Sequence, residues 1–182
     1  MGVEDFMPNT KPAHRRVNIT INCRGMRIGV DSSVWLHELA LRHAAAVVVH
    51  KDFTGLVKSF TARANHLVYR GITPVFVFDG APAAAKGGTD AARAVRCAKA
   101  YAAYEQSIQD ADPTPAHLRA AIRITWDIVT LVIDALRERG FAYFVAPFEA
   151  DGQLAKLSHA GLVDGIFTID TDLTVLGGGG AG

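Results

Sequence analysis

Four short runs of β-branched and aromatic residues constrain the fold of this chain more than any other feature of its sequence. Each run has the usual length of a strand, and its side chains are mostly apolar without alternation. The predicted strands are Met26–Val30, Pro74–Phe78, Ala142–Ala146 and Gly165–Ile169. Because uninterrupted apolar character is typical of parallel strands buried on both faces, the pattern predicts an α/β fold with a parallel sheet and helices on both of its faces.

The segments between these strands are long enough for helices. The predicted helix Thr114–Arg139 opens on a capping residue, which is followed by Pro115, a residue suited to the first turn, and it ends before Gly140. The predicted helix Asp90–Gln109 is rich in alanine and has little bulky apolar surface, so we expect it to stand partly away from the core. The predicted helices are Ser33–His50, Asp52–Tyr69, Asp90–Gln109, Thr114–Arg139 and Glu149–Ala160.

Composition places the 182 residues among ordinary globular domains, since 49% are apolar and 20% are charged. No apolar run is long enough to predict a membrane span, and two cysteines are too few for a disulfide framework or a four-cysteine zinc site. The net charge of +1 conceals an asymmetry, because residues 141–182 carry a net charge of −4. An acidic segment beside a basic one suits a metal site that faces a polyanion, although ordinary scatter of surface charge is the alternative.

Acidic residues follow every predicted strand. Because the carboxyl ends of parallel strands lie along one edge of a sheet, these acids should gather there. Clustered carboxylates need cations to stay ionised, and ligands with oxygen alone favour Mg²⁺ or Mn²⁺ over zinc. Two such ions can activate a water and stabilise the leaving oxygen of a phosphodiester. The alternative is that each acid only caps a helix or a turn. The six candidates are Asp31, Asp79, Glu149, Asp151, Asp170 and Asp172.

The six acids lie in four blocks of sequence. The blocks are Ile28–His37 (IGVDSSVWLH), Gly71–Gly80 (GITPVFVFDG), Val145–Ala155 (VAPFEADGQLA) and Asp170–Leu173 (DTDL). The first two resemble parts of the N-terminal block of the nuclease domain in the flap endonuclease/XPG superfamily, and the third is similar to its internal block, which the fourth closes. The strings Trp-Leu-His and Ala-Pro-Phe-Glu-Ala-Asp, together with the spacing of the blocks, look most like the exonuclease-one branch.

This resemblance implies a core like that of PIN domains and 5′ nucleases over residues 1–176. It places the N-terminal block at residues 1–100 and the internal block from about residue 138. It also implies a helical arch at about residues 82–113. Independently of the resemblance, the low-complexity sequence of residues 177–182 (GGGGAG) predicts a glycine-rich tail.

The resemblance further implies a structure-specific 5′ nuclease that hydrolyses DNA phosphodiesters with two Mg²⁺ ions, for which Mn²⁺ can substitute. The six acids match the metal ligands of the family, and Lys86 and Arg93 match the basic pair that stabilises the scissile phosphate. The expected partner is DNA with 5′ ends, flaps or single-strand/duplex junctions, the expected location is the nucleus, and no membrane is involved. The positions implied to contact DNA are Gly2, His37, Arg96 and Lys99.

Two alternatives stay open. The family continues with a further acid and a helix–two-turn–helix element, whereas this chain stops at Gly182. A truncated, noncatalytic DNA-binding remnant of the same fold is therefore one alternative. The other is a phosphatase of the haloacid dehalogenase type, because residues 170–174 (DTDLT) match its Asp-x-Asp-x-Thr pattern with Asp170 as nucleophile. Only eight residues follow Thr174, however, and that family places its other motifs downstream.

Overall fold

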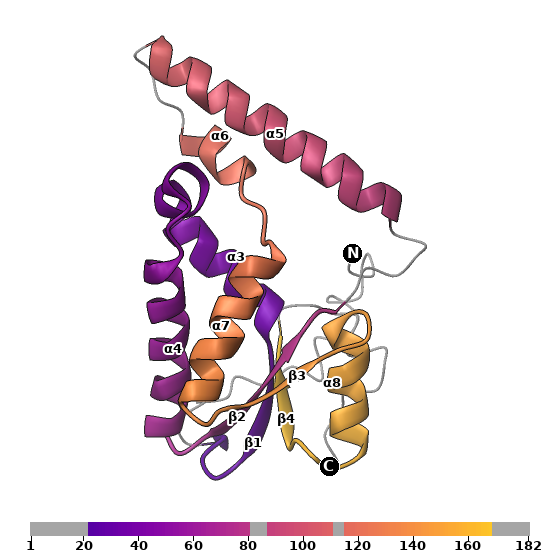
Figure 1. Ribbon diagram of the computed structural model, residues 1–182. Coiled ribbons are helices and arrows are strands. Elements are labelled where there is room, and N and C mark those ends of the chain that lie inside the picture. The colour runs from indigo at the N-terminus through magenta and orange to yellow at the C-terminus, as the bar shows by residue number, and fades with distance from the viewer. Residues whose placement is uncertain (1–21, 81–86, 111–114, 169–182) are drawn as a thin grey trace, which may run out of the picture. The chain divides into compact units, whose positions relative to one another are not determined.

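The computed structural model describes residues 22–80, 87–110 and 115–168 (Figure 1). Within these ranges, parallel strands form one sheet in the order β3-β2-β1-β4. Each strand overlaps a predicted run, so the expected parallel sheet is confirmed. The strands are β1 (Arg27–Asp31), β2 (Thr73–Phe78), β3 (Ala142–Val145) and β4 (Gly165–Phe167).

Helices occupy the segments between the strands. Most of them agree with the expected positions to within a few residues. The segment expected as one helix before Lys51 consists of α3 followed by a π-helical turn, Ala46–His50, and Lys51 ends that turn with a left-handed backbone at φ 53°. The helices are α3 (Ser32–Arg42), α4 (Thr54–Tyr69), α5 (Gly87–Gln109), α6 (Pro115–Ala120), α7 (Trp126–Glu138) and α8 (Ala150–His159). No helix in the described part of the chain is long and apolar enough to cross a membrane.

The single helix expected over Thr114–Arg139 was wrong, since α6 and α7 are separate helices joined by residues 121–125. The connection contains Ile122, Ile124 and Thr125, and β-branched side chains lose rotamer freedom in a helix. A second helix then starts at Trp126, with Asp127 in its first turn, where a negative charge suits the helix dipole.

The chain divides into two compact units. The sheet unit contains all four strands, α8 and the last turns of α4. The helical unit contains Trp35–Thr61 and Pro82–Ala135. It therefore holds most of α3, the π-helical turn, the start of α4, all of α5 and α6, and most of α7.

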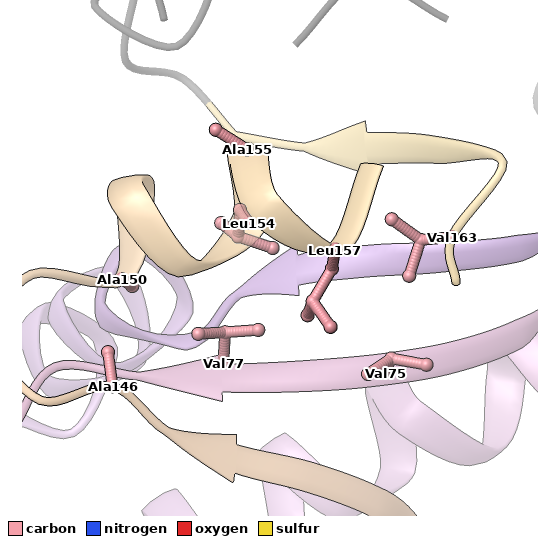
Figure 2. Packing of buried hydrophobic residues seen from close by; sticks show 8 residues of the cluster. All are labelled: Val75, Val77, Ala146, Ala150, Leu154, Ala155, Leu157 and Val163. Carbon is pink, nitrogen blue, oxygen red and sulfur yellow. The ribbon is translucent and has the colours of Figure 1, made fainter. Parts of the chain in front are cut away.

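The core of the sheet unit lies between α8 and the sheet. Val75 and Val77 of β2 point toward Leu154 and Leu157 of α8, and all four are at most 8% exposed (Figure 2). A Cβ on Gly29 would lie 2.8 Å from Cδ2 of Leu154, so glycine in β1 lets this helix approach the sheet closely. The alternate side chains of β2 are buried on the opposite face, as predicted. The expected burial was wrong for the two edge strands, since the residues of β3 are exposed or half-buried and those of β4 are half-buried.

The helical unit has contacts of its own. Trp35 and Phe60 pack with ring centroids 5.4 Å apart, and a hydrogen bond of 2.9 Å joins Nε2 of His43 to Oγ of Ser59. Lys51 places its ammonium group 5.9 Å from the ring centroid of Tyr101 on α5. No residue between positions 91 and 109 of α5 is buried, as its alanine-rich sequence predicts.

Candidate metal centre

Asp31 and Asp79 stand at the carboxyl ends of two neighbouring strands. Asp31 is the last residue of β1 and pairs in register with Val77, and Asp79 directly follows β2. Asp31 is only 6% exposed, whereas Asp79 is exposed. The parallel pairing of these strands thus brings together two carboxylates that are 48 positions apart in the chain.

The carboxylate of Asp31 is held by three hydrogen bonds. Its Oδ1 accepts the backbone N–H groups of Ser33 at 3.0 Å and of Val34 at 3.4 Å, so Asp31 caps the first turn of α3. Its Oδ2 accepts the hydroxyl of Thr168, just after β4, at 3.3 Å. Burial raises the pKa of Asp31 above its ordinary value, and the charge of Asp79 raises it further, although the three hydrogen bonds oppose the rise.

Two donors from different elements hold the carboxylate of Asp79. The hydroxyl of Ser33 donates to Oδ2 at 2.5 Å, and the backbone N–H of Ala150 donates to Oδ1 at 2.7 Å. Glu149, at the N-cap position of α8, makes no side-chain capping bond. Asp79 therefore caps α8 from another part of the chain, and this bond brings the start of α8 to the end of β2.

The loop before α8 is clamped onto the end of β2. Ala146 donates its N–H to the carbonyl of Phe78 at 2.9 Å, and Gly80 donates to the carbonyl of Phe148 at 2.6 Å. A Cβ at Gly80 would lie 1.8 Å from the carbonyl oxygen of Ala146, so this approach requires glycine. The clamp sets the backbone that carries Glu149 and Asp151 beside Asp79.

Four of the six predicted metal ligands lie in the described ranges, whereas Asp170 and Asp172 lie outside them. Asp31 and Asp79 are brought together, and the start of α8 adds Glu149, which is exposed, and Asp151, which is half-buried. No group of three or more His, Cys, Asp or Glu side chains within the described ranges is close enough to hold a metal ion. Asp31 and Asp79 themselves fit a hard cation, because they offer oxygen donors and a cation would relieve their mutual repulsion.

The other predicted site residues are distributed differently. His37 is exposed on α3, and Arg93, Arg96 and Lys99 are exposed on α5. All four belong to the helical unit. Gly2 and Lys86 lie outside the described residues.

The donors that hold the two carboxylates were not predicted from the sequence. Ser33 stands two residues after Asp31, where a capping pattern places a backbone donor, so that contact had a local signal. The bonds from Ser33 to Asp79 and from Thr168 to Asp31 span 46 and 137 positions and have no local signal.

The chain matches two regions of the XPG family. The XPG N-terminal domain matches residues 1–100, and the XPG I-region matches residues 140–180. Exodeoxyribonuclease 1 of Schizosaccharomyces pombe is 31% identical over 97% of this chain, and Exonuclease 1 of Drosophila melanogaster is 29% identical over the same share. The chain spans 31% and 24% of the lengths of these two relatives.

Solved structures of similar fold support the architecture. The catalytic core of Rad2 in complex with DNA substrate superposes with a TM-score of 0.64 at 29% identity, over 97% of this chain and 48% of that chain. Human GEN1 in complex with Holliday junction DNA has a TM-score of 0.63 at 21% identity, over 99% of this chain and 39% of that chain. The mixed α/β fold with a parallel sheet is common to all three.

Proposed function

The chain belongs to the XPG family, in which it is similar to the exonuclease 1 proteins, and from this membership we propose that it is a metal-dependent 5′ nuclease acting on DNA. The observation that most supports the proposal is the pairing of Asp31 with Asp79 at the ends of adjacent strands. Both residues lie within the matched XPG N-terminal domain, and donors from α3 and α8 hold their carboxylates.

The proposed metal ligands are the six acids predicted from the sequence. Bound Mg²⁺ ions would supply an activated water and stabilise the leaving oxygen of the phosphodiester. Asp31 and Asp79 present oxygen atoms whose directions their hydrogen bonds fix, and ordered ligands of this kind bind metal more tightly than mobile ones. Glu149 and Asp151 add carboxylates at the start of α8. Asp170 and Asp172 complete the proposed set.

The basic residues are proposed to act on the DNA. Lys86 and Arg93 orient the scissile phosphate and offset the negative charge that builds on it during hydrolysis. Arg96 and Lys99 add attraction for the phosphate backbone, while His37 and Gly2 contact the DNA end. We propose 5′→3′ exonuclease or flap endonuclease activity in DNA repair or recombination, in the nucleus. The relatives named above are eukaryotic.

A noncatalytic DNA-binding remnant of the same fold is the second candidate. One observation favours it, namely that α5, in the segment expected to form the arch, is rich in alanine and carries only three basic residues, Arg93, Arg96 and Lys99. The two candidates differ in turnover, because the remnant would bind DNA without hydrolysing it.

A cleavage assay separates the two candidates. The purified chain is incubated with a 5′-flap DNA and with a 5′-recessed duplex, in Mg²⁺ and in EDTA, beside the variant Asp79→Asn. This variant keeps an oxygen that can accept the N–H of Ala150. A nuclease releases 5′ products only with Mg²⁺ and loses this activity in Asp79→Asn. A remnant would fold and bind both DNAs but would cleave neither. Its affinity for DNA would be the same in the wild type and in Asp79→Asn.

A further inference from the structure

Ser33 contacts both aspartates of the candidate metal centre. Its backbone N–H donates to Oδ1 of Asp31 at 3.0 Å, and its hydroxyl donates to Oδ2 of Asp79 at 2.5 Å. The two contacts use different atoms of one residue in the first turn of α3. Ser33 is thus a bridge between the carboxyl ends of β1 and β2.

The direction of the second hydrogen bond follows from the chemistry of the two groups. An ionised carboxylate can only accept hydrogen bonds, so the hydroxyl of Ser33 is the donor. The N–H of Ala150 occupies the other oxygen of Asp79 at 2.7 Å. With both oxygens held, rotation of the Asp79 carboxylate would break at least one of these bonds. If the hydroxyl of Ser33 were removed, one of these two hydrogen bonds would remain, the one from the N–H of Ala150.

The need for such a donor is greatest at Asp79. Asp31 is buried and its carboxylate accepts three hydrogen bonds, two of them from the backbone. Asp79 is exposed, and one of its two described donors is the side chain of Ser33. An exposed carboxylate loses its orientation more readily than a buried one when a donor is removed.

We propose that Ser33 is a positioning residue that orients Asp79 toward the divalent cation and couples it to Asp31. This inference rests on the proposed function, since it assumes that both aspartates bind the metal. Partners that orient metal ligands typically change metal affinity about 10- to 100-fold when they are mutated. Ser33 itself need not touch the metal or the DNA.

The test compares two variants of nearly identical shape, Ser33→Thr and Ser33→Val. Threonine keeps a hydroxyl at this position and valine replaces it with a methyl group. Mn²⁺ binding to the full chain is measured by titration calorimetry in the absence of DNA, so the readout does not depend on cleavage. We expect Ser33→Val to bind Mn²⁺ about 10- to 100-fold more weakly than wild type, and Ser33→Thr to remain within about threefold of it.

The neighbouring residue Ser32 provides a matched control. Its hydroxyl is buried and has no hydrogen-bond partner in the described part of the chain. Ser32→Ala should therefore leave Mn²⁺ affinity unchanged. Circular dichroism and urea unfolding establish that all the variants fold before they are compared.

The outcomes separate this inference from the proposed function. If Ser33→Val binds Mn²⁺ as tightly as wild type while Asp79→Asn binds weakly, the positioning role is wrong and the nuclease proposal stands. If Ser33→Val and Ser33→Thr weaken binding equally, the hydroxyl is not responsible and the role is again wrong. A wild-type chain that neither binds Mn²⁺ nor cleaves DNA overturns both.

Discussion

The backbone nitrogen of Ala150 lies 2.7 Å from Oδ1 of Asp79, although 71 positions separate the two residues. One carboxylate therefore caps α8 and also stands beside Asp31 in the candidate metal centre. Asp31 likewise combines two roles, because it caps α3 and belongs to the candidate metal centre. Capping and metal binding are compatible here, since each carboxylate oxygen has more than one lone pair.

Replacing Asp79 separates these two roles. Asp79→Ala removes the acceptor for the N–H of Ala150 and should lower the free energy of unfolding by about 1 kcal/mol, the usual cost of losing a helix cap. Asp79→Asn keeps an acceptor and should lose less stability. Both variants should lose cleavage, as should Asp172→Ala. Urea unfolding and the flap assay measure the two effects, and a variant that cleaves at the wild-type rate would remove its residue from the mechanism.

Replacing Asp31 with asparagine should stabilise the metal-free protein at neutral pH. Burial first, and then the charge of Asp79, raise the pKa of Asp31 above its ordinary value of 3.8. Protonation of Asp31 therefore favours the folded state, and this contribution is present below pH 3.8 and lost as the pH rises through the folded-state pKa. In EDTA, Asp31→Asn should be more stable than wild type at pH 7, and the difference should vanish below pH 3.8.

Asp52 provides a control for which the expected change in stability has the opposite sign. Its pKa is lowered by hydrogen bonds from Thr54 at the start of α4, so its charged form favours the folded state above pH 3.8. Asp52→Asn should be less stable than wild type at pH 7 and should approach it in acid. If Asp31→Asn were also destabilised at pH 7, the hydrogen bonds of Asp31 would outweigh the cost of burying its charge.

Gly80 should not tolerate a side chain. A Cβ there would lie 1.8 Å from the backbone oxygen of Ala146, which is itself held by the hydrogen bond between Ala146 and Phe78. We expect Gly80→Ala to cost about 3 kcal/mol or more in unfolding free energy. Gly152 is the matched control, because a Cβ there meets nothing within 4 Å. Gly152→Ala within α8 should raise the free energy of unfolding by about 0.5–1 kcal/mol. Equal effects of the two substitutions would contradict the close contact between Gly80 and the backbone of Ala146.

Lys86 and Lys99 should affect different steps of the reaction. Lys86→Ala removes a cation proposed to offset charge on the scissile phosphate, so the single-turnover rate should fall about 100-fold with little change in DNA affinity. Lys99→Ala should weaken DNA binding and reduce its salt dependence, with the single-turnover rate at saturating enzyme preserved. Equal single-turnover rates for Lys86→Ala and wild type would defeat the assignment of Lys86.

The strands were predictable because their signal is local. Buried parallel strands are apolar along their whole length, and β2 lies within one residue of the predicted run. The break within the helix expected over Thr114–Arg139 was not predicted, because capping signals at the two ends of this segment suggested one continuous helix. Ile122, Ile124 and Thr125 weaken a helix there, but propensity is a weak guide when tertiary contacts decide.

The gathering of Asp31 and Asp79 was predictable from topology, since parallel neighbours end at the same edge of a sheet. The side-chain contacts that hold these carboxylates were not. Hydrogen bonds from Ser33 to Asp79 and from Thr168 to Asp31 depend on how distant segments approach each other, and one sequence carries no periodic signal for them.

Anomalous diffraction from crystals of the chain grown with Mn²⁺ and a DNA that has a 5′ end would test the proposed metal centre most directly. We predict Mn²⁺ peaks within coordinating distance of both Asp31 and Asp79, with the start of α8 beside them. Well-ordered carboxylates without a Mn²⁺ peak between them, or a peak bound by other residues alone, would contradict the proposed metal centre.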